Sequence, residues 1–171
     1  HLAAEAIMTT DTKPKESAVT FEIQGRTCTL GGMTKGAGMI HPNMGTMLCF
    51  LTTDCEIEKL ALMDALKDAV KDSFNMISVD GDTSTNDTCI VLSNGAAENP
   101  LITRESEDYS IFLEAIRTVT KDLAKQMAAD GEGASRLFEA KVIHAASEKD
   151  ARVLAKSVIT SNLTKAAIFG K

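Results

Sequence analysis

The stretch that decides the fold is residues 18–53, which read AVTFEIQGRTCTLGGMTKGAGMIHPNMGTMLCFLTT. Residues 17–30 alternate apolar and polar side chains on either side of Gly25, and this pattern predicts two strands joined by a turn. Residues 31–46 hold five glycines and one proline, a composition typical of a loop. The apolar run over residues 46–54 then predicts a short buried strand.

The rest of the chain alternates helical and strand patterns. An apolar stripe at helical spacing predicts a helix over residues 56–74. The other expected elements are strands over residues 88–93 and 137–147, helices over residues 106–128 and 148–161, and a strand or turn over residues 163–171. Strand pairs among long helices indicate layers of helix and sheet, an α/β or α+β fold.

Composition excludes several classes of partner. The chain has 171 residues, enough for one domain with a core, and a net charge of -6, so we expect no binding to nucleic acid or to an anionic membrane. No apolar run is long enough to span a bilayer, and the first residues lack a signal-peptide pattern. Cys28, Cys49, Cys55 and Cys89 show no metal-binding spacing, so we expect reduced thiols and no metal site.

A threonine stands where the glycine-rich loop meets the third strand. The Thr46 hydroxyl is a poor nucleophile without a neighbouring base, and no Ser/His/Asp or Cys/His set is evident. A threonine at a chain terminus has such a base in its own α-amino group, whose pKa is about 8. This would require cleavage after Gly45, which has no Cβ to hinder attack on its carbonyl. On composition alone, a Gly-Thr pair at such a junction is more often an ordinary turn.

Seven blocks of the sequence stand out together. They are AIMTTDT (6–12), GGMTKGAGMIHPNM (31–44), TML (46–48), FNM (74–76), VDGDTSTNDT (79–88), DGEGA (130–134) and KAAIFG (165–170). In this order they resemble the ArgJ family, the ornithine acetyltransferases or bifunctional glutamate N-acetyltransferases. The resemblance implies a layered α/β/β/α sandwich of the DmpA/ArgJ-like type. Residues 1–171 would be a single central portion of that domain, spanning a cleavage junction at 45/46, with the N- and C-terminal parts of the enzyme absent.

The resemblance implies acyl transfer in arginine biosynthesis. The family cleaves itself before the threonine that matches Thr46, which then moves an acetyl group from N-acetylornithine to glutamate; some members also accept acetyl-CoA. Its substrate contacts map to Thr9, Lys35, Thr46 and Glu132, where the Lys35 cation suits a carboxylate and the Glu132 anion suits an ammonium group. The family implies no cofactor and no metal. It also implies a homo-oligomer or α/β heterotetramer in the cytoplasm, or in the mitochondrial matrix of a fungus.

Two features depart from the family pattern. Gly45 stands where the family usually has alanine. The family's oxyanion-hole Thr-Gly pair would precede His1, and its C-terminal substrate contacts, an Asn and a Thr or Ser, would follow Lys171. Because stabilisation of the oxyanion is often the largest catalytic term, we expect little transferase activity from these residues alone.

Other interpretations stay open at this stage. The same threonine would also serve an N-terminal-nucleophile aminopeptidase or amidase of related fold, and the chain could be an inactive folded module. The acidic stretch over residues 80–87 fails the EF-hand pattern, since it lacks the glycine and the glutamate at the required positions. We expect it to form a hydrogen-bonded turn that lines the site.

Overall fold

The computed structural model describes residues 1–40, 47–84 and 86–170. The elements in chain order are α1 (Leu2–Ala6), β1 (Lys15–Ile23), β2 (Arg26–Lys35), β3 (Leu48–Thr53), α2 (Lys59–Lys71), the 3-10 helix η1 (Phe74–Met76), β4 (Thr88–Ser93), α3 (Tyr109–Ala129), α4 (Glu148–Ile159) and α5 (Asn162–Phe169).

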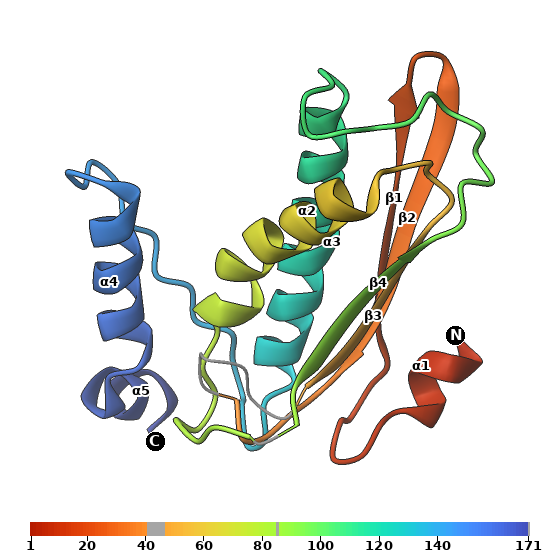
Figure 1. Ribbon diagram of the computed structural model, residues 1–171. Coiled ribbons are helices and arrows are strands. Elements are labelled where there is room, and N and C mark those ends of the chain that lie inside the picture. The colour runs from red at the N-terminus through yellow and green to blue at the C-terminus, as the bar shows by residue number, and fades with distance from the viewer. Residues whose placement is uncertain (41–46, 85, 171) are drawn as a thin grey trace.

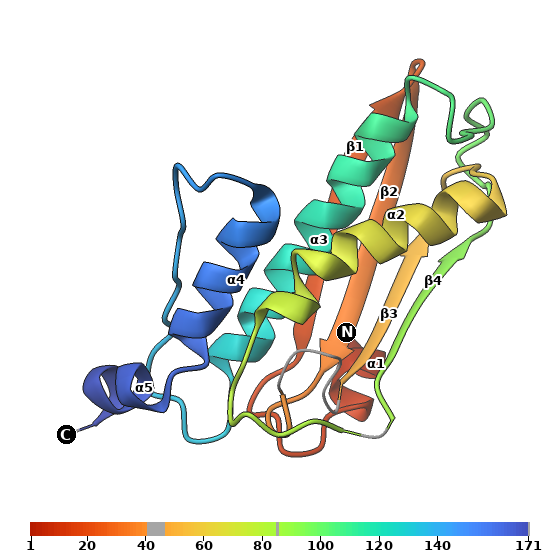
Figure 2. The ribbon, with the colours of Figure 1, turned by 60° about the vertical axis from the view of Figure 1, so that its left-hand side comes forward.

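The four strands form one sheet in the order β1-β2-β3-β4. The first three strands pair antiparallel, and β4 pairs parallel to β3. A parallel neighbour requires a crossover connection, which α2 provides between β3 and β4. Helices α2 and α3 lie on one side of this sheet, and α1 lies on the other side near its lower end (Figure 1). Figure 2 shows α3 running along β1 and β2, with α4 and α5 beyond it.

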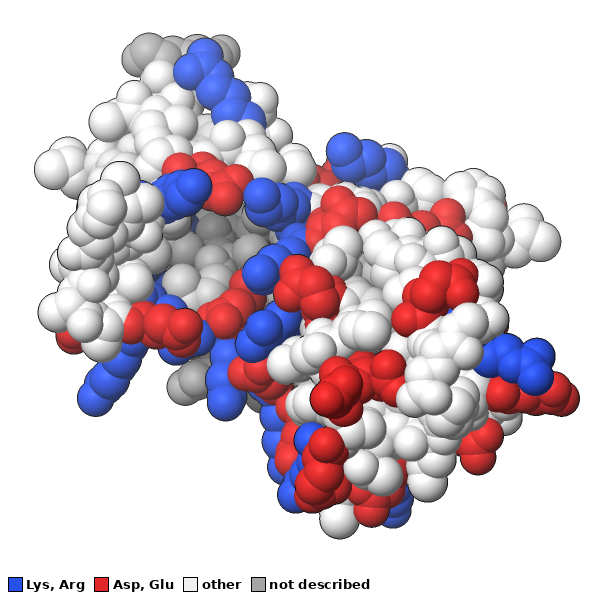
Figure 3. Space-filling model, turned by 90° about the horizontal axis from the view of Figure 1, so that it is seen from above, with Lys and Arg blue, Asp and Glu red and all other residues white. Residues whose placement is uncertain are grey.

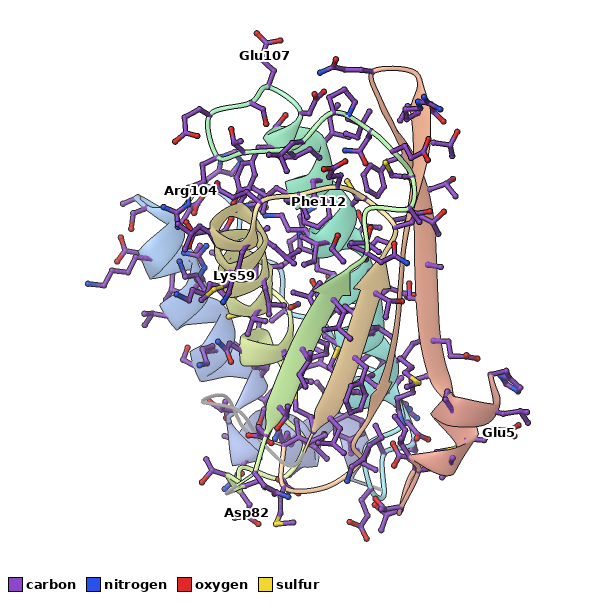
Figure 4. All side chains as sticks on the ribbon, turned by 45° about the vertical axis from the view of Figure 1, so that its right-hand side comes forward. Glu5, Lys59, Asp82, Arg104, Glu107 and Phe112 are labelled. Carbon is purple, nitrogen blue, oxygen red and sulfur yellow. The ribbon has the colours of Figure 1, made fainter. Side chains whose placement is uncertain are left out.

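The core lies between the sheet and α3. Alternation along β1 buries Ile23 fully and leaves Glu22 exposed, because successive side chains point to opposite faces of a strand. The ring of Phe21 meets that of Phe112 edge to face, with centroids 6.1 Å apart. Phe112 projects from α3 toward the sheet in Figure 4, and its side chain is fully buried with that of Leu123. The apolar face of α3 therefore determines how this helix packs on the sheet.

The expected loop over residues 31–46 begins later than its glycines indicated, since β2 continues to Lys35. This part of the prediction was wrong for a steric reason. Gly32 pairs with Leu51 across the sheet and faces α3, where a Cβ would overlap the Leu51 side chain and lie 3.2 Å from Leu123 Cδ1. The glycine permits close packing inside a strand here, and does not end the strand.

Two C-terminal predictions were also wrong. Residues 137–147 form no strand: none of the four described strands pairs with them, and a strand needs a partner for its backbone groups. Residues 162–169 form the helix α5, where a strand or turn was expected. The Ser161 side chain caps this helix by accepting the Thr164 N–H at 3.3 Å. The expected helices over 56–74, 106–128 and 148–161 are present as α2, α3 and α4.

The mixed helix-and-sheet class is confirmed, and α2 with α3 forms the helical layer on one face of the sheet. The face of the sheet away from α3 carries large apolar side chains. Met33 pairs with Phe50, and Phe50 pairs with Ile90, which is 39% exposed; Leu92 on the same face is 62% exposed. No helix among the described residues is both long and apolar enough to cross a membrane.

Candidate functional site

A pocket of about 350 Å³ lies at the end of the sheet where β2 stops. It is lined by four segments of the chain, namely residues 9–10, residues 35–39, Asp80 with Asp82, and Glu132. In Figure 4 the labelled Asp82 marks this end of the molecule, and Glu107 marks the opposite end. Lys35 lies at the pocket because it is the last residue of β2, and the chain then bends over residues 37–39.

Three of the residues that the family resemblance assigned to substrate binding line this one pocket. Lys35 Nζ donates a hydrogen bond to Thr9 Oγ1 at 3.5 Å. Glu132 follows the end of α3, and its backbone N–H donates to the Ala37 carbonyl at 2.7 Å, which joins it to the turn after Lys35. The fold thus brings together one cation, one anion and one hydroxyl from segments far apart in the sequence. Their roles toward a substrate stay a prediction.

Gly38 allows the Glu132 carboxylate to approach the turn. A Cβ at Gly38 would lie 2.8 Å from Glu132 Oε2 and 3.7 Å from Asp80 Oδ2. The first distance is shorter than any ordinary carbon contact, so a larger residue would displace the Glu132 side chain. Glycine at this position therefore sets where the Glu132 carboxylate lies.

The acidic stretch over residues 80–87 holds the glycine-rich turn in place. The Asp80 carboxylate accepts the backbone N–H groups of Met39 at 2.6 Å and of Ile40 at 3.1 Å. Val79 N–H donates in turn to the Ile40 carbonyl at 2.7 Å. Met39 adopts a positive φ of 52°, an unusual conformation for a residue with a side chain, and these bonds fix it. The expected hydrogen-bonded turn at the pocket is therefore present in the described part of this stretch.

Gly45 and Thr46, the expected cleavage junction and nucleophile, lie outside the described residues. The next residue, Met47, is buried, and its backbone N–H donates to Asp87 Oδ1 at 2.8 Å. Thr88 N–H donates to the Met47 carbonyl at 3.0 Å. Burial raises the pKa of Asp87, and the bond from Met47 N–H offsets only part of that rise.

Beneath the pocket lies a buried ionic cluster that the sequence analysis did not identify. Lys15 Nζ contacts Asp11 Oδ1 at 2.5 Å and Asp130 Oδ2 at 2.6 Å, and its side chain is fully buried. One sequence signal could have found it: Lys15 has the same strand parity as Ile23, so the alternation of β1 directs both toward α3. Because a lysine is almost never fully buried without a partner, this position required nearby carboxylates.

Burial alone would raise the pKa values of Asp11 and Asp130, but their hydrogen-bond partners lower these pKa values by more. For Asp11, the bonds from Gly36 N–H and from the Lys15 ammonium hold its pKa below the usual value. For Asp130, the Lys15 ammonium and the hydroxyl and N–H of Thr12 have the same effect on its pKa. Both groups are therefore carboxylates at neutral pH.

A larger cavity of about 1000 Å³ lies between α4, α5, η1 and the C-terminal half of α3. Seen from above in Figure 3, the molecule is hollowed between a side lobe and the main body, with Lys and Arg side chains at the border of the hollow. Glu132 borders this cavity as well, but Thr9 and Lys35 do not. The smaller pocket is lined by Thr9, Lys35 and Glu132 together, so it is the candidate site.

Among the described residues no cluster of His, Cys, Asp or Glu could hold a metal ion.

Comparison with known proteins identifies the family. Relatives named arginine biosynthesis bifunctional protein ArgJ are 55% identical over 98% of the chain in Clostridium acetobutylicum, 56% over 99% in Symbiobacterium thermophilum, and 51% over 97% in Bacillus subtilis. The chain spans about two fifths of the length of these relatives, 41%, 42% and 41% in turn. A crystal structure of the arginine biosynthesis bifunctional protein ArgJ from Bacillus halodurans matches 70% of the chain and 55% of its own, with 44% identity and a TM-score of 0.66. The model of the ArgJ family matches residues 1–171, and the chain belongs to that family.

Proposed function

We propose that the enzyme containing this chain transfers an acetyl group from N-acetylornithine to glutamate through an ester on Thr46. The observation that carries this proposal is the presence of opposite charges in one pocket of an ArgJ-family chain. Lys35 and Glu132 line the same 350 Å³ space as the hydroxyl of Thr9. The pocket therefore presents the Lys35 cation together with carboxylates, Glu132 among them. A pocket that carries both charges suits amino-acid substrates, which also carry both.

The nucleophile is generated by cleavage of the chain before Thr46. The Thr46 hydroxyl attacks the Gly45 carbonyl and the peptide C–N bond breaks, which leaves an ester and a free α-amino group. Water then hydrolyses this ester, giving a Gly45 carboxylate and a Thr46 with both a hydroxyl and an adjacent amine. The buried Met47 N–H bond to Asp87 anchors the residue that follows the nucleophile.

The transfer then proceeds in two balanced steps. The Thr46 α-amino group takes the hydroxyl proton as the oxygen attacks the acetyl carbonyl of N-acetylornithine; the amide C–N bond breaks, and ornithine leaves with that proton. In the second step the amino group of glutamate attacks the ester, N-acetylglutamate leaves, and the oxygen of Thr46 regains a proton. An ester intermediate divides a difficult amide exchange into two easier steps. No cofactor is needed, and acetyl-CoA would serve as an alternative donor.

The remaining parts of the same enzyme are the expected partners of this chain. They would supply the oxyanion hole and the further substrate contacts. The exposed apolar side chains of Ile90 and Leu92 on the open sheet face support a second layer contributed by those parts. We also propose a homo-oligomer or α/β heterotetramer. Cytoplasmic placement is proposed because the cysteines are free thiols, as reducing compartments maintain them.

The test uses the full-length enzyme with Thr46→Ala and, as a matched control, Thr118→Ala, which removes an exposed hydroxyl on α3. Intact mass spectrometry measures cleavage at 45/46, and acetyl transfer from N-acetylornithine to isotope-labelled glutamate measures activity. We expect Thr46→Ala to abolish both, and Thr118→Ala to change neither. Wild-type activity retained by Thr46→Ala would refute the proposal.

The aminopeptidase alternative differs in the acceptor. A hydrolase would give acetate or a free amine at the same rate whether or not glutamate is present. We expect glutamate to accept the acetyl group in preference to water, because the Lys35 and Glu132 charges match an amino acid. Product ratios at increasing glutamate concentration separate the two functions.

A further inference from the structure

Lys15 holds two acids that lie under different sides of the candidate site. Its side chain is fully buried, as is that of Asp11, and the side chain of Asp130 is 4% exposed. Replacing a buried ion cluster by apolar residues is often neutral for stability or even favourable, so stability alone does not account for it. The second set of bonds made by each acid shows what the cluster connects.

Asp11 connects the Thr9 side of the pocket with the Lys35 side. Its carboxylate accepts the Thr9 N–H at 3.2 Å and the Gly36 N–H at 2.7 Å. Thr9 is itself a pocket residue, and Gly36 directly follows Lys35. One carboxylate therefore fixes the backbone at both of these residues.

Asp130 fixes the Glu132 side. It ends α3, and it accepts the Thr12 N–H at 3.0 Å and the Thr12 hydroxyl. Two residues later the Glu132 N–H binds the Ala37 carbonyl. The ammonium group of Lys15 lies between these two acids, so it joins the N-terminal segment, the end of β2 and the end of α3 at one point.

We propose that Lys15 is a positioning residue that sets the separation of the Lys35 cation from the Glu132 anion through Asp11 and Asp130. This inference rests on the proposed function, in which those two charges bind the substrate. Lys15 is buried below the pocket and does not line it. Its loss should therefore weaken substrate binding more than it slows the chemical step, because both charges would shift relative to each other.

The experiment compares Lys15→Met with Lys13→Met in the full-length enzyme. Lys13 lies two residues earlier and is exposed, so the control removes the same charge without touching the cluster. We expect Lys15→Met to raise KM for N-acetylornithine and for glutamate by about tenfold or more, with kcat changing by less than about threefold. Hydrogen–deuterium exchange should rise in residues 9–12, 35–38 and 130–134. Lys13→Met should match the wild type in every measurement.

Two further variants keep the test decisive if Lys15→Met does not fold. Asp11→Asn and Asp130→Asn are isosteric substitutions. Each leaves Lys15 paired with the one remaining aspartate, and that pair has no net charge. Asp11→Asn should increase exchange in residues 9–12 and 35–38, whereas Asp130→Asn should increase it in residues 130–134, and each should raise KM. Folded variants with wild-type exchange and wild-type KM would overturn the proposal.

The failure of the two proposals can be told apart. If the wild-type enzyme transfers no acetyl group between these substrates, the proposed function is wrong. The exchange pattern then decides the positioning role alone, because it needs no substrate. Wild-type activity together with unchanged exchange in the folded variants would refute positioning and leave the proposed function standing.

Discussion

At the scale of single residues, Gly38 in the pocket and Gly131 at the end of α3 have different roles. A Cβ on Gly38 would clash with the end of the flexible Glu132 side chain, at 2.8 Å, and would make an ordinary contact with Asp80 Oδ2 at 3.7 Å. A Cβ on Gly131 would lie 2.9 Å from Val79 Cγ1 and 3.3 Å from the Ala128 carbonyl, a contact with packed side chain and backbone. Gly38 therefore leaves room for the Glu132 carboxylate in the pocket, whereas Gly131 allows close packing against Val79 and the Ala128 carbonyl.

We expect Gly38→Ala to impair activity without loss of stability. Its backbone lies outside the left-handed region, so alanine introduces no strain, and Glu132 is the group that must move. KM should rise severalfold while the melting temperature stays within about 2 °C. Gly131→Ala is the contrasting variant and should destabilise the protein by about 1–3 kcal/mol through overpacking. Equal loss of stability in both variants would contradict the assignment of Gly38 to the pocket.

At the scale of elements, α4 is joined to the end of α2 by one bidentate ion pair. Arg152 Nε contacts Asp72 Oδ1 at 2.5 Å, and a second guanidinium nitrogen contacts Asp72 Oδ2 at 3.0 Å. The hydrogen bonds from Arg152 lower the pKa of Asp72 despite its partial burial. No residue of α4 is buried, so few apolar contacts hold this helix in its place.

We expect Arg152→Met to increase local opening of α4 more than it lowers the stability of the whole protein. The pair is about one-third exposed, so its loss should cost only about 0.5–1 kcal/mol. Amide exchange over residues 148–159 should increase, while exchange in α3 stays as in the wild type. Lys149→Met removes an exposed charge from the same helix and is the control. If both variants left exchange in α4 unchanged, the ion pair would not be what holds the helix.

At the scale of the whole molecule, the buried cluster of Lys15, Asp11 and Asp130 makes the free energy of unfolding depend on pH in acid. The pKa values of Asp11 and Asp130 in the folded protein lie below the ordinary value of 3.8. Unfolded chains therefore bind more protons than folded ones in acid. The contribution of these carboxylates to the free energy of unfolding is complete above the unfolded pKa and is lost as pH falls through the lowered folded values.

Urea unfolding of the full-length enzyme between pH 7 and pH 3 measures this effect. The wild type should lose stability steeply below about pH 4. The triple variant D11N/K15M/D130N has no charge left in the cluster, so its stability should fall less over the same range. Parallel curves for the two proteins would show that acid unfolding has another origin.

The sequence by itself determined the helices α2, α3 and α4, the strand pair β1 and β2, and the family. Apolar periodicity is a local property, and short blocks such as DGEGA and KGAGM carry the resemblance without any structure. The nucleophile Thr46 and its partner Gly45 stay predictions of this kind. The three expected contacts Thr9, Lys35 and Glu132 were also named from these blocks.

Only the tertiary structure decided which residues from distant segments contact one another. Gly32 looked like part of a loop, and it lies in a strand because Leu51 and Leu123 pack against it. The sequence analysis did not identify Lys15, which is buried because Asp11 and Asp130 converge on it from segments 119 residues apart in the chain (130 − 11). The strand parity of Lys15 indicates that it faces inward, but its partners depend on which distant segments the fold brings together, and local sequence patterns do not contain that information.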